Sequence, residues 1–143
     1  MKGNELSERL FKFAARVILF TRILPEDAEY KVIKYQLVKS AGSVGANYEE
    51  AQSASSSADF TYKVEISLRE MRESNYWLRL LKEIALNKSD NNSKEIDFLI
   101  DESNQIKKIL GSIVYKIKNN NISPGQLNVI LKLLTFDFKL LTY

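Results

Sequence analysis

Residues 35–51, with the sequence YQLVKSAGSVGANYEEA, combine a helical apolar period with a run of very small side chains. From Ile33 to Ala51 the apolar residues are spaced by four and three positions, which is the period of one face of an α-helix. Small side chains let a neighbouring helix approach closely, although a glycine inside a helix costs about 1 kcal/mol relative to alanine. We therefore expect a helix that is buried against neighbours on more than one side, in an all-α protein. Its small residues are Ser40, Ala41, Gly42, Ser43, Gly45 and Ala46.

Apolar residues at the same spacing recur in three other segments, so four helices are expected in total. The first three cover about residues 4–21, 26–52 and 58–86, and the fourth runs from about residue 92 to residue 119. Leu24-Pro25 ends the first helix, because proline cannot continue the hydrogen-bond ladder. Ser56 or Ser57 is expected to cap the third helix, and Asn92 or Ser93 the fourth. Helices joined by such short turns predict an antiparallel, up-down-up-down four-helix bundle.

We expect one domain over residues 1–119, followed by a C-terminal extension over residues 120–143. The extension begins with the helix-breaking sequence Ser123-Pro124-Gly125 and is rich in leucine and phenylalanine. Phe136, Phe138 and Leu140 alternate with polar residues as in a strand, whereas residues 127–134 equally fit a short helix. Its role stays open between docking on the bundle, binding a partner, membrane association and no role in function, with docking favoured over a membrane.

The sequence of 143 residues contains no cysteine and no histidine, which excludes several kinds of site. Without cysteine there is no disulfide and no Cys-based zinc or iron–sulfur centre, which fits a cytoplasmic location. Without histidine, Ser-His-Asp catalysis and the Glu-x-x-His di-iron sites of helical bundles are excluded. No signal peptide and no membrane-spanning segment is expected. The sequence therefore predicts no enzymatic activity, no cofactor and no membrane partner.

The net charge of +3 is only mildly basic, but the positive excess is concentrated in the first helix. Arg9, Lys12, Arg16 and Arg22 are the candidate contacts for the phosphates of RNA or DNA. The alternative is that these side chains form an ordinary solvated helix face.

Two further groups of residues have a structural and a functional interpretation. Tyr76 and Trp77 could stack on bases, but at helical spacing beside leucines we favour a role in the core or in a subunit interface. The carboxylates on the second and third helices could hold a hard cation. We favour surface charges and interhelical hydrogen bonds instead, in which Glu50 and Glu70 pair with Arg69, Arg72 or Gln36. The residues of this second group are Asn47, Glu49, Glu50, Glu65, Glu70 and Glu73.

Residues 35–52 and 58–83 resemble bacterial four-helix-bundle proteins named after open reading frames in 23S ribosomal RNA intervening sequences. The resemblance extends over about residues 10–118 and includes the turn at Leu24-Pro25. In the first block the matching positions are Gln36, Leu37, Ser40, Ser43, Val44, Asn47, Glu50 and Ala51. In the second block they are Ala58, Phe60, Lys63, Leu68, Glu70, Glu73, Tyr76, Trp77, Leu78 and Leu81.

This resemblance implies a four-helix protomer, commonly assembled as a five-fold ring, with no assigned catalytic activity. A distantly similar group, the accessory proteins of diversity-generating retroelements, forms basic pentamers that work with a reverse transcriptase and nucleic acid. We therefore expect a non-enzymatic homopentameric scaffold that binds RNA or DNA through Arg9, Lys12, Arg16 and Arg22. The alternative is an adaptor that binds a protein such as a polymerase and makes no nucleic-acid contact.

Overall fold

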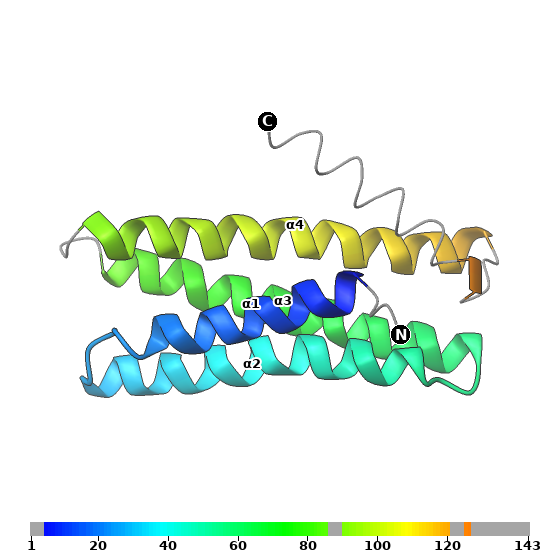
Figure 1. Ribbon diagram of the computed structural model, residues 1–143, viewed down its shortest axis with the longest axis horizontal. Coiled ribbons are helices and arrows are strands. Elements are labelled where there is room, and N and C mark those ends of the chain that lie inside the picture. Colours follow the sequence, from blue (N-terminus) through cyan, green and yellow to red (C-terminus); the bar gives the residue numbers. More distant parts are fainter. Residues whose placement is uncertain (1–4, 86–89, 121–124, 127–143) are drawn as a thin grey trace.

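The chain folds into four α-helices, each antiparallel to the next along the chain, as the sequence predicts (Figure 1). A computed structural model describes residues 5–85, 90–120 and 125–126. The helices are α1 (Glu5–Thr21), α2 (Ala28–Gln52), α3 (Ser57–Ile84) and α4 (Asp90–Asn120), and the described residues contain no strand. The all-α four-helix bundle is thus confirmed. The strand or helix expected within residues 127–143 lies outside the described residues.

The turns follow the local signals in the sequence, with one exception. In the turn at Leu24-Pro25, the Lys34 ammonium donates to the Leu24 carbonyl at 3.0 Å and to Glu26 at 2.5 Å. Ser56 is the N-cap of α3, because its hydroxyl accepts from the backbone N–H of Asp59 at 3.1 Å. The exception is α4, which begins at Asp90, two residues before the earlier of the two predicted caps. An aspartate at this end is favoured by the positive end of the helix dipole.

A single apolar core runs along the axis of the bundle, and all four helices contribute to it. α2 and α4 each pack closely against α3, whereas α1 packs mainly on α2 and only sparsely on α4. α1 is also the shortest helix, with 17 residues against 31 in α4. α1, which the sequence predicts to be basic, is therefore held mainly by its packing against α2. Its contacts with α4 include ion pairs between charged side chains. Core residues that are fully buried include Leu10, Val17, Leu37, Val44, Val64, Met71, Leu78, Leu99, Ile106 and Ile113.

The small residues of α2 are buried on two sides and open on the third. Ser40 and Ala41 face the core, and Gly45 lies against α1, where an added Cβ would stand 3.7 Å from the Leu10 Cβ. Gly42 and Ala46 face outward, and a Cβ at Gly42 would meet nothing within 4 Å. The prediction of burial on more than one side is right for the faces toward α1 and α3. It is wrong for the outward face, which no other helix in the described part of the chain covers.

Small hydroxyls link α2 to α3 inside the core. The Ser67 hydroxyl donates to the Val44 carbonyl at 2.6 Å, and the Ser40 and Ser74 hydroxyls lie 2.8 Å apart. Among the described residues, no buried side-chain nitrogen or oxygen lacks a hydrogen-bond partner. Ser40, Ser67 and Ser74 thus hold α2 and α3 together and are buried from solvent.

Candidate functional site

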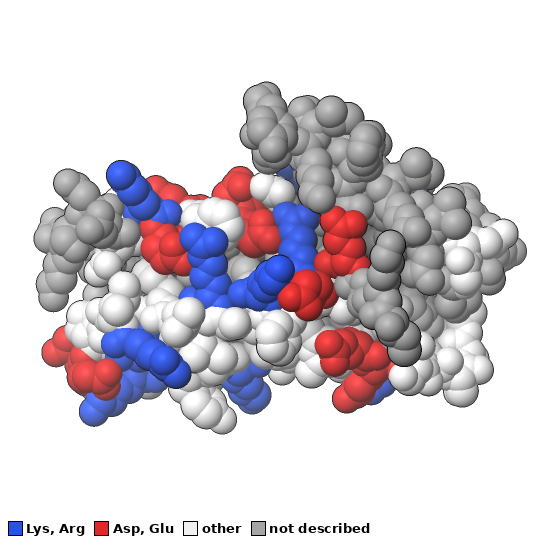
Figure 2. Space-filling model, in the orientation of Figure 1, with Lys and Arg blue, Asp and Glu red and all other residues white. Residues whose placement is uncertain are grey.

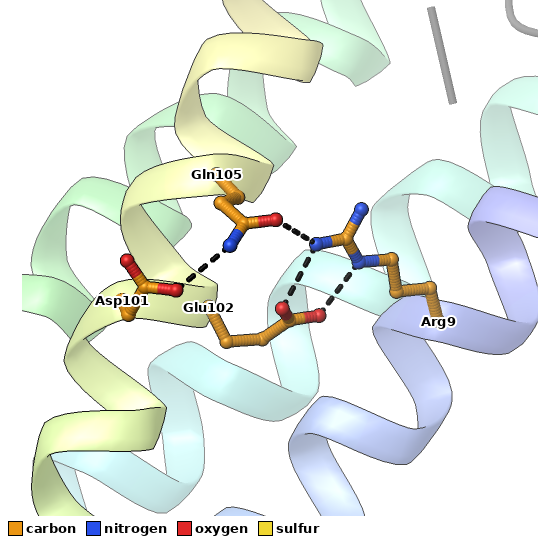
Figure 3. A network of polar contacts seen from close by, with 4 residues as sticks. All are labelled: Arg9, Asp101, Glu102 and Gln105. Carbon is orange, nitrogen blue, oxygen red and sulfur yellow. Dashed lines mark hydrogen bonds and ion pairs between the residues drawn. The ribbon is translucent and has the colours of Figure 1, made fainter. Parts of the chain in front are cut away.

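Arg9, the first candidate phosphate contact, is bound to carboxylate and amide groups of α4. Its guanidinium donates from Nε and Nη2 to the two oxygens of Glu102, at 2.6 and 2.8 Å, and from Nη2 to Gln105 at 2.9 Å (Figure 3). Gln105 in turn donates to Asp101 at 2.7 Å. Bidentate pairs of this kind fix both side chains in one orientation. The hydrogen bonds that Arg9 donates to Glu102 raise the pKa of Arg9, so this contact stabilises the charged guanidinium.

Arg16, which lies about two helical turns after Arg9 on the same side of α1, makes an equivalent contact with α4. It donates from Nε and Nη2 to the two oxygens of Glu95, at 2.6 and 3.0 Å, and its guanidinium carbon lies 3.7 Å from the centre of the Phe98 ring. The hydrogen bonds from Arg16 hold the pKa of Glu95 below its usual value. Charged side chains of both signs accordingly gather along the seam between α1 and α4 (Figure 2).

The other two candidate cations differ from these two arginines. Lys12 lies 3.5 Å from Glu8 in an exposed i,i+4 pair, and Arg22 is exposed at the end of α1. A phosphate approaching α1 would therefore compete with a carboxylate at three of the four predicted positions. Phosphate binding by these four residues stays a prediction, and the geometry gives Arg9 and Arg16 a structural role in joining α1 to α4.

The carboxylates of α2 and α3 are dispersed and do not form a metal site. In the part of the chain that the structure describes, no group of three or more acidic side chains could hold a metal ion. The predicted partners of Glu50 are wrong, because Glu50 pairs with Lys63 at 2.5 Å. Burial is the main cause that raises the pKa of Glu70, followed by the nearby charge of Glu73. Gln36 is half-buried on α2.

Within α2, the Asn47 amide donates to the carbonyl of Ser43 at 2.8 Å. This hydrogen bond stays inside one helix, so it presents neither residue to a ligand.

Tyr76 and Trp77 lie side by side on α3, with different exposure. Their rings meet edge to face with centroids 5.0 Å apart, and the Trp77 indole donates to Glu73 at 3.1 Å. Trp77 packs on the core, whereas Tyr76 remains 50% exposed. Tyr76 also borders an open groove between α3 and α4, together with Arg79, Leu80, Lys82, Glu83 and Ile100.

A cluster of cations outside the four predicted phosphate contacts lies at the seam between α3 and α4. Arg79 and Lys107 both donate to the side-chain carbonyl of Asn75, at 3.1 and 3.2 Å. Asn75 and Lys107 are 32 positions apart, so no local pattern could place them together. The i,i+4 spacing of Asn75 and Arg79 predicts that these two side chains are neighbours on one helix, but such pairs are common on helix surfaces.

The outward surface of α1 and α2 carries large apolar side chains. On α1, Phe11 is 64% exposed and Leu19 is 58% exposed, and on α2, Tyr35 is 66% exposed. An open groove borders this surface where Ala15 and Leu19 of α1, and Ile23 just after it, lie beside Arg16 and Glu95. We call the exposed apolar residues of α1 and the turn after it the outer apolar face: Phe11, Ile18, Leu19 and Ile23.

Comparison with known proteins agrees with the fold. The family model described as 23S rRNA-intervening sequence protein matches residues 2–112. A crystal structure of a protein of unknown function from the S23 ribosomal protein family of Bacteroides thetaiotaomicron is similar, with 31% sequence identity and a TM-score of 0.66. The match covers 76% of this chain and 96% of that chain. The comparison with curated proteins gives no match. Within the described residues, no helix has the length and apolar character needed to cross a membrane.

Proposed function

Because this chain belongs to the family of 23S rRNA-intervening sequence proteins, we propose that it is a non-enzymatic scaffold that assembles with itself into a homopentamer. The observation that supports self-assembly is the outer apolar face, which no other helix of the described residues covers. Monomeric soluble proteins seldom expose large contiguous apolar patches, and such patches mark interaction sites. A second copy of the chain is the occupant that we assign to this face. We place the protein in the cytoplasm because its sequence lacks cysteine.

Light scattering tests this proposal, because the mass of one chain is 16.5 kDa. The parent protein should have the mass of five chains, and the double variant Phe11→Ser/Leu19→Ser should have the mass of one. Both side chains point away from the core, so the variant should keep its helical circular dichroism spectrum. Tyr115→Ser, at an equally exposed aromatic residue on α4, is the matched control and should remain pentameric. A monomeric parent, or an assembly that the double variant leaves intact, contradicts the proposal.

The second part of the proposal is RNA or DNA binding through Arg9, Lys12, Arg16 and Arg22. It is supported by the family resemblance and by the position of Arg22, which is exposed. Lys12→Gln/Arg22→Gln removes the two exposed cations without breaking the contacts of Arg9 and Arg16 to α4. If α1 contacts phosphates, this variant should bind nucleic acid more weakly than the parent and with a smaller dependence on salt.

The alternative function is an adaptor that binds a protein such as a polymerase and makes no nucleic-acid contact. It is favoured by the half-exposed Tyr76 beside the groove that Leu80 and Ile100 line. An adaptor of this kind should retain neither RNA nor DNA at about 50 mM salt, where electrostatic binding is strong. Retention of either nucleic acid at that salt concentration excludes it.

A further inference from the structure

A buried amide holds two cations side by side at the seam between α3 and α4. Asn75 is 2% exposed, and its carbonyl oxygen accepts from Arg79 Nε at 3.1 Å and from Lys107 Nζ at 3.2 Å. Its amide nitrogen donates to the Ser103 hydroxyl at 2.8 Å and to the side-chain oxygen of Asn104 at 3.2 Å. Because both donors of the amide are occupied, its carbonyl is fixed toward the two cations. The cations thus share one neutral oxygen as their acceptor.

In contrast to the arginines at the seam between α1 and α4, these two cations are not neutralised by ion pairs among the described residues, although Glu83 borders the same groove as Arg79. Within the described ranges, neither Arg79 nor Lys107 forms an ion pair. Burial lowers the pKa of Lys107, and the like charges of Arg79, Arg72 and Lys108 lower it further. Three cations therefore lie close enough to Lys107 to disfavour its charge. An anion placed among them would relieve that repulsion.

The two central cations keep most of their hydrogen-bonding capacity. A guanidinium has five N–H donors and an ammonium has three, and Asn75 takes one from each. The remaining donors can bind the oxygens of a phosphate, for which arginine supplies a planar fork and lysine a point charge. Ion pairs bound the cluster at both ends of the seam, Lys82 with Asp97 and Lys118 with Glu65.

We propose that the seam between α3 and α4 is a phosphate-binding site, with Arg79 and Lys107 as its central contacts and Arg72 and Lys108 beside them. The phosphate is that of a nucleic-acid backbone, because Tyr76 borders the same groove as Arg79 and is half exposed. An exposed aromatic ring next to cations is the combination that binds single-stranded nucleic acid, by stacking on a base while the cations hold the backbone. A free phosphate would use the same cations without Tyr76. This site depends neither on self-assembly nor on the cations of α1.

Three double variants, each of which removes two positive charges, test the site against its alternatives. Arg79→Gln/Lys107→Gln alters the seam, and Lys12→Gln/Arg22→Gln alters α1. Lys31→Gln/Lys94→Gln alters two exposed lysines elsewhere and controls for net charge. All substitutions lie on the surface or at its edge, so circular dichroism and light scattering should show an unchanged fold and an unchanged mass. Assembly is thus measured separately from binding.

The probe is a fluorescent oligouridine of about 20 nucleotides, followed by anisotropy between about 50 and 200 mM salt. The seam variant should bind about tenfold more weakly than the parent, and the slope of its log affinity against log salt should be shallower by about 1.4, the value for two lost contacts to a single strand. The charge control should stay close to the parent, and the α1 variant should lose less affinity than the seam variant. Equal weakening in all three variants, a larger loss in the α1 variant, or a parent that does not bind overturns the proposal.

Two further measurements distinguish the source of the phosphate. Tyr76→Ala should weaken oligouridine binding several-fold if a base stacks on the ring, because such contacts are worth about 1–3 kcal/mol each. Inorganic pyrophosphate should then displace the oligouridine only weakly. If pyrophosphate competes strongly and Tyr76→Ala binds like the parent, the backbone assignment is overturned in favour of free phosphate.

Discussion

A double-mutant cycle on Arg9 and Glu102 decides whether this arginine belongs to the fold or is available to a ligand. Arg9→Met keeps the apolar stem and removes the charge, and Glu102→Gln keeps the shape of the partner. Exposed ion pairs contribute about 0.2–1 kcal/mol, whereas removing one member of a fully buried pair costs about 3–5 kcal/mol. The two side chains are 25% and 16% exposed and joined by two short hydrogen bonds. We therefore expect a coupling energy of about 1.5 kcal/mol, between the two limits.

The assay is urea unfolding of the parent, both single variants and the double variant, followed by circular dichroism at one protein concentration. A fixed concentration is needed because assembly adds to apparent stability. Lys12 and Glu8 supply a matched control, since this pair is 74% and 60% exposed and should couple by about 0.3 kcal/mol. A coupling energy for Arg9 and Glu102 that is no larger than the control refutes the reasoning. Arg9 would then be as available to a phosphate as Lys12.

Three other perturbations have expected outcomes. Gly42→Ala should stabilise the protein by about 0.5–1 kcal/mol in thermal unfolding, because the added Cβ meets nothing within 4 Å; a loss of stability would contradict the open position. Ser67→Ala should destabilise by about 1 kcal/mol in urea, since it removes the 2.6 Å hydrogen bond to the Val44 carbonyl; a neutral result would show that this bond contributes nothing. The pKa of Glu95 is lowered by Arg16, so this contact stabilises the fold fully above the unfolded pKa of about 4.3 and loses that effect as the pH falls through the folded value. The difference in urea midpoint between the parent and Glu95→Gln should accordingly shrink between about pH 6 and pH 3, and a constant difference would contradict the contact.

The helices could be predicted from the sequence because their signals are local. Leu24-Pro25 stops α1, Ser56 caps α3, and the apolar residues of each helix repeat at the period of one face. Each of these features depends on residues that are close in the chain. The start of α4 was less accurate, because several polar residues in succession can all cap a helix.

The partners of the charged residues could not be predicted, because they depend on which helices become neighbours and at what axial offset. Arg9 and Glu102 are 93 positions apart, and Arg16 and Glu95 are 79 apart. The sequence places a positive excess on the first helix, but it does not reveal that carboxylates of α4 lie opposite. The same uncertainty hid the cluster around Asn75, where the cations come from two different helices.

The three polar contacts that Asn75 makes with α4 also set how far α3 and α4 can slide along each other. A seam of leucine and isoleucine alone would tolerate a shift by one heptad, since one apolar side chain can replace another in each layer. Such a shift would separate the amide from Ser103 and Asn104 and leave it unsatisfied, at a cost of about 1–3 kcal/mol. One asparagine therefore favours a single alignment of the two longest helices, and with it the spacing of every side chain presented along their shared edge.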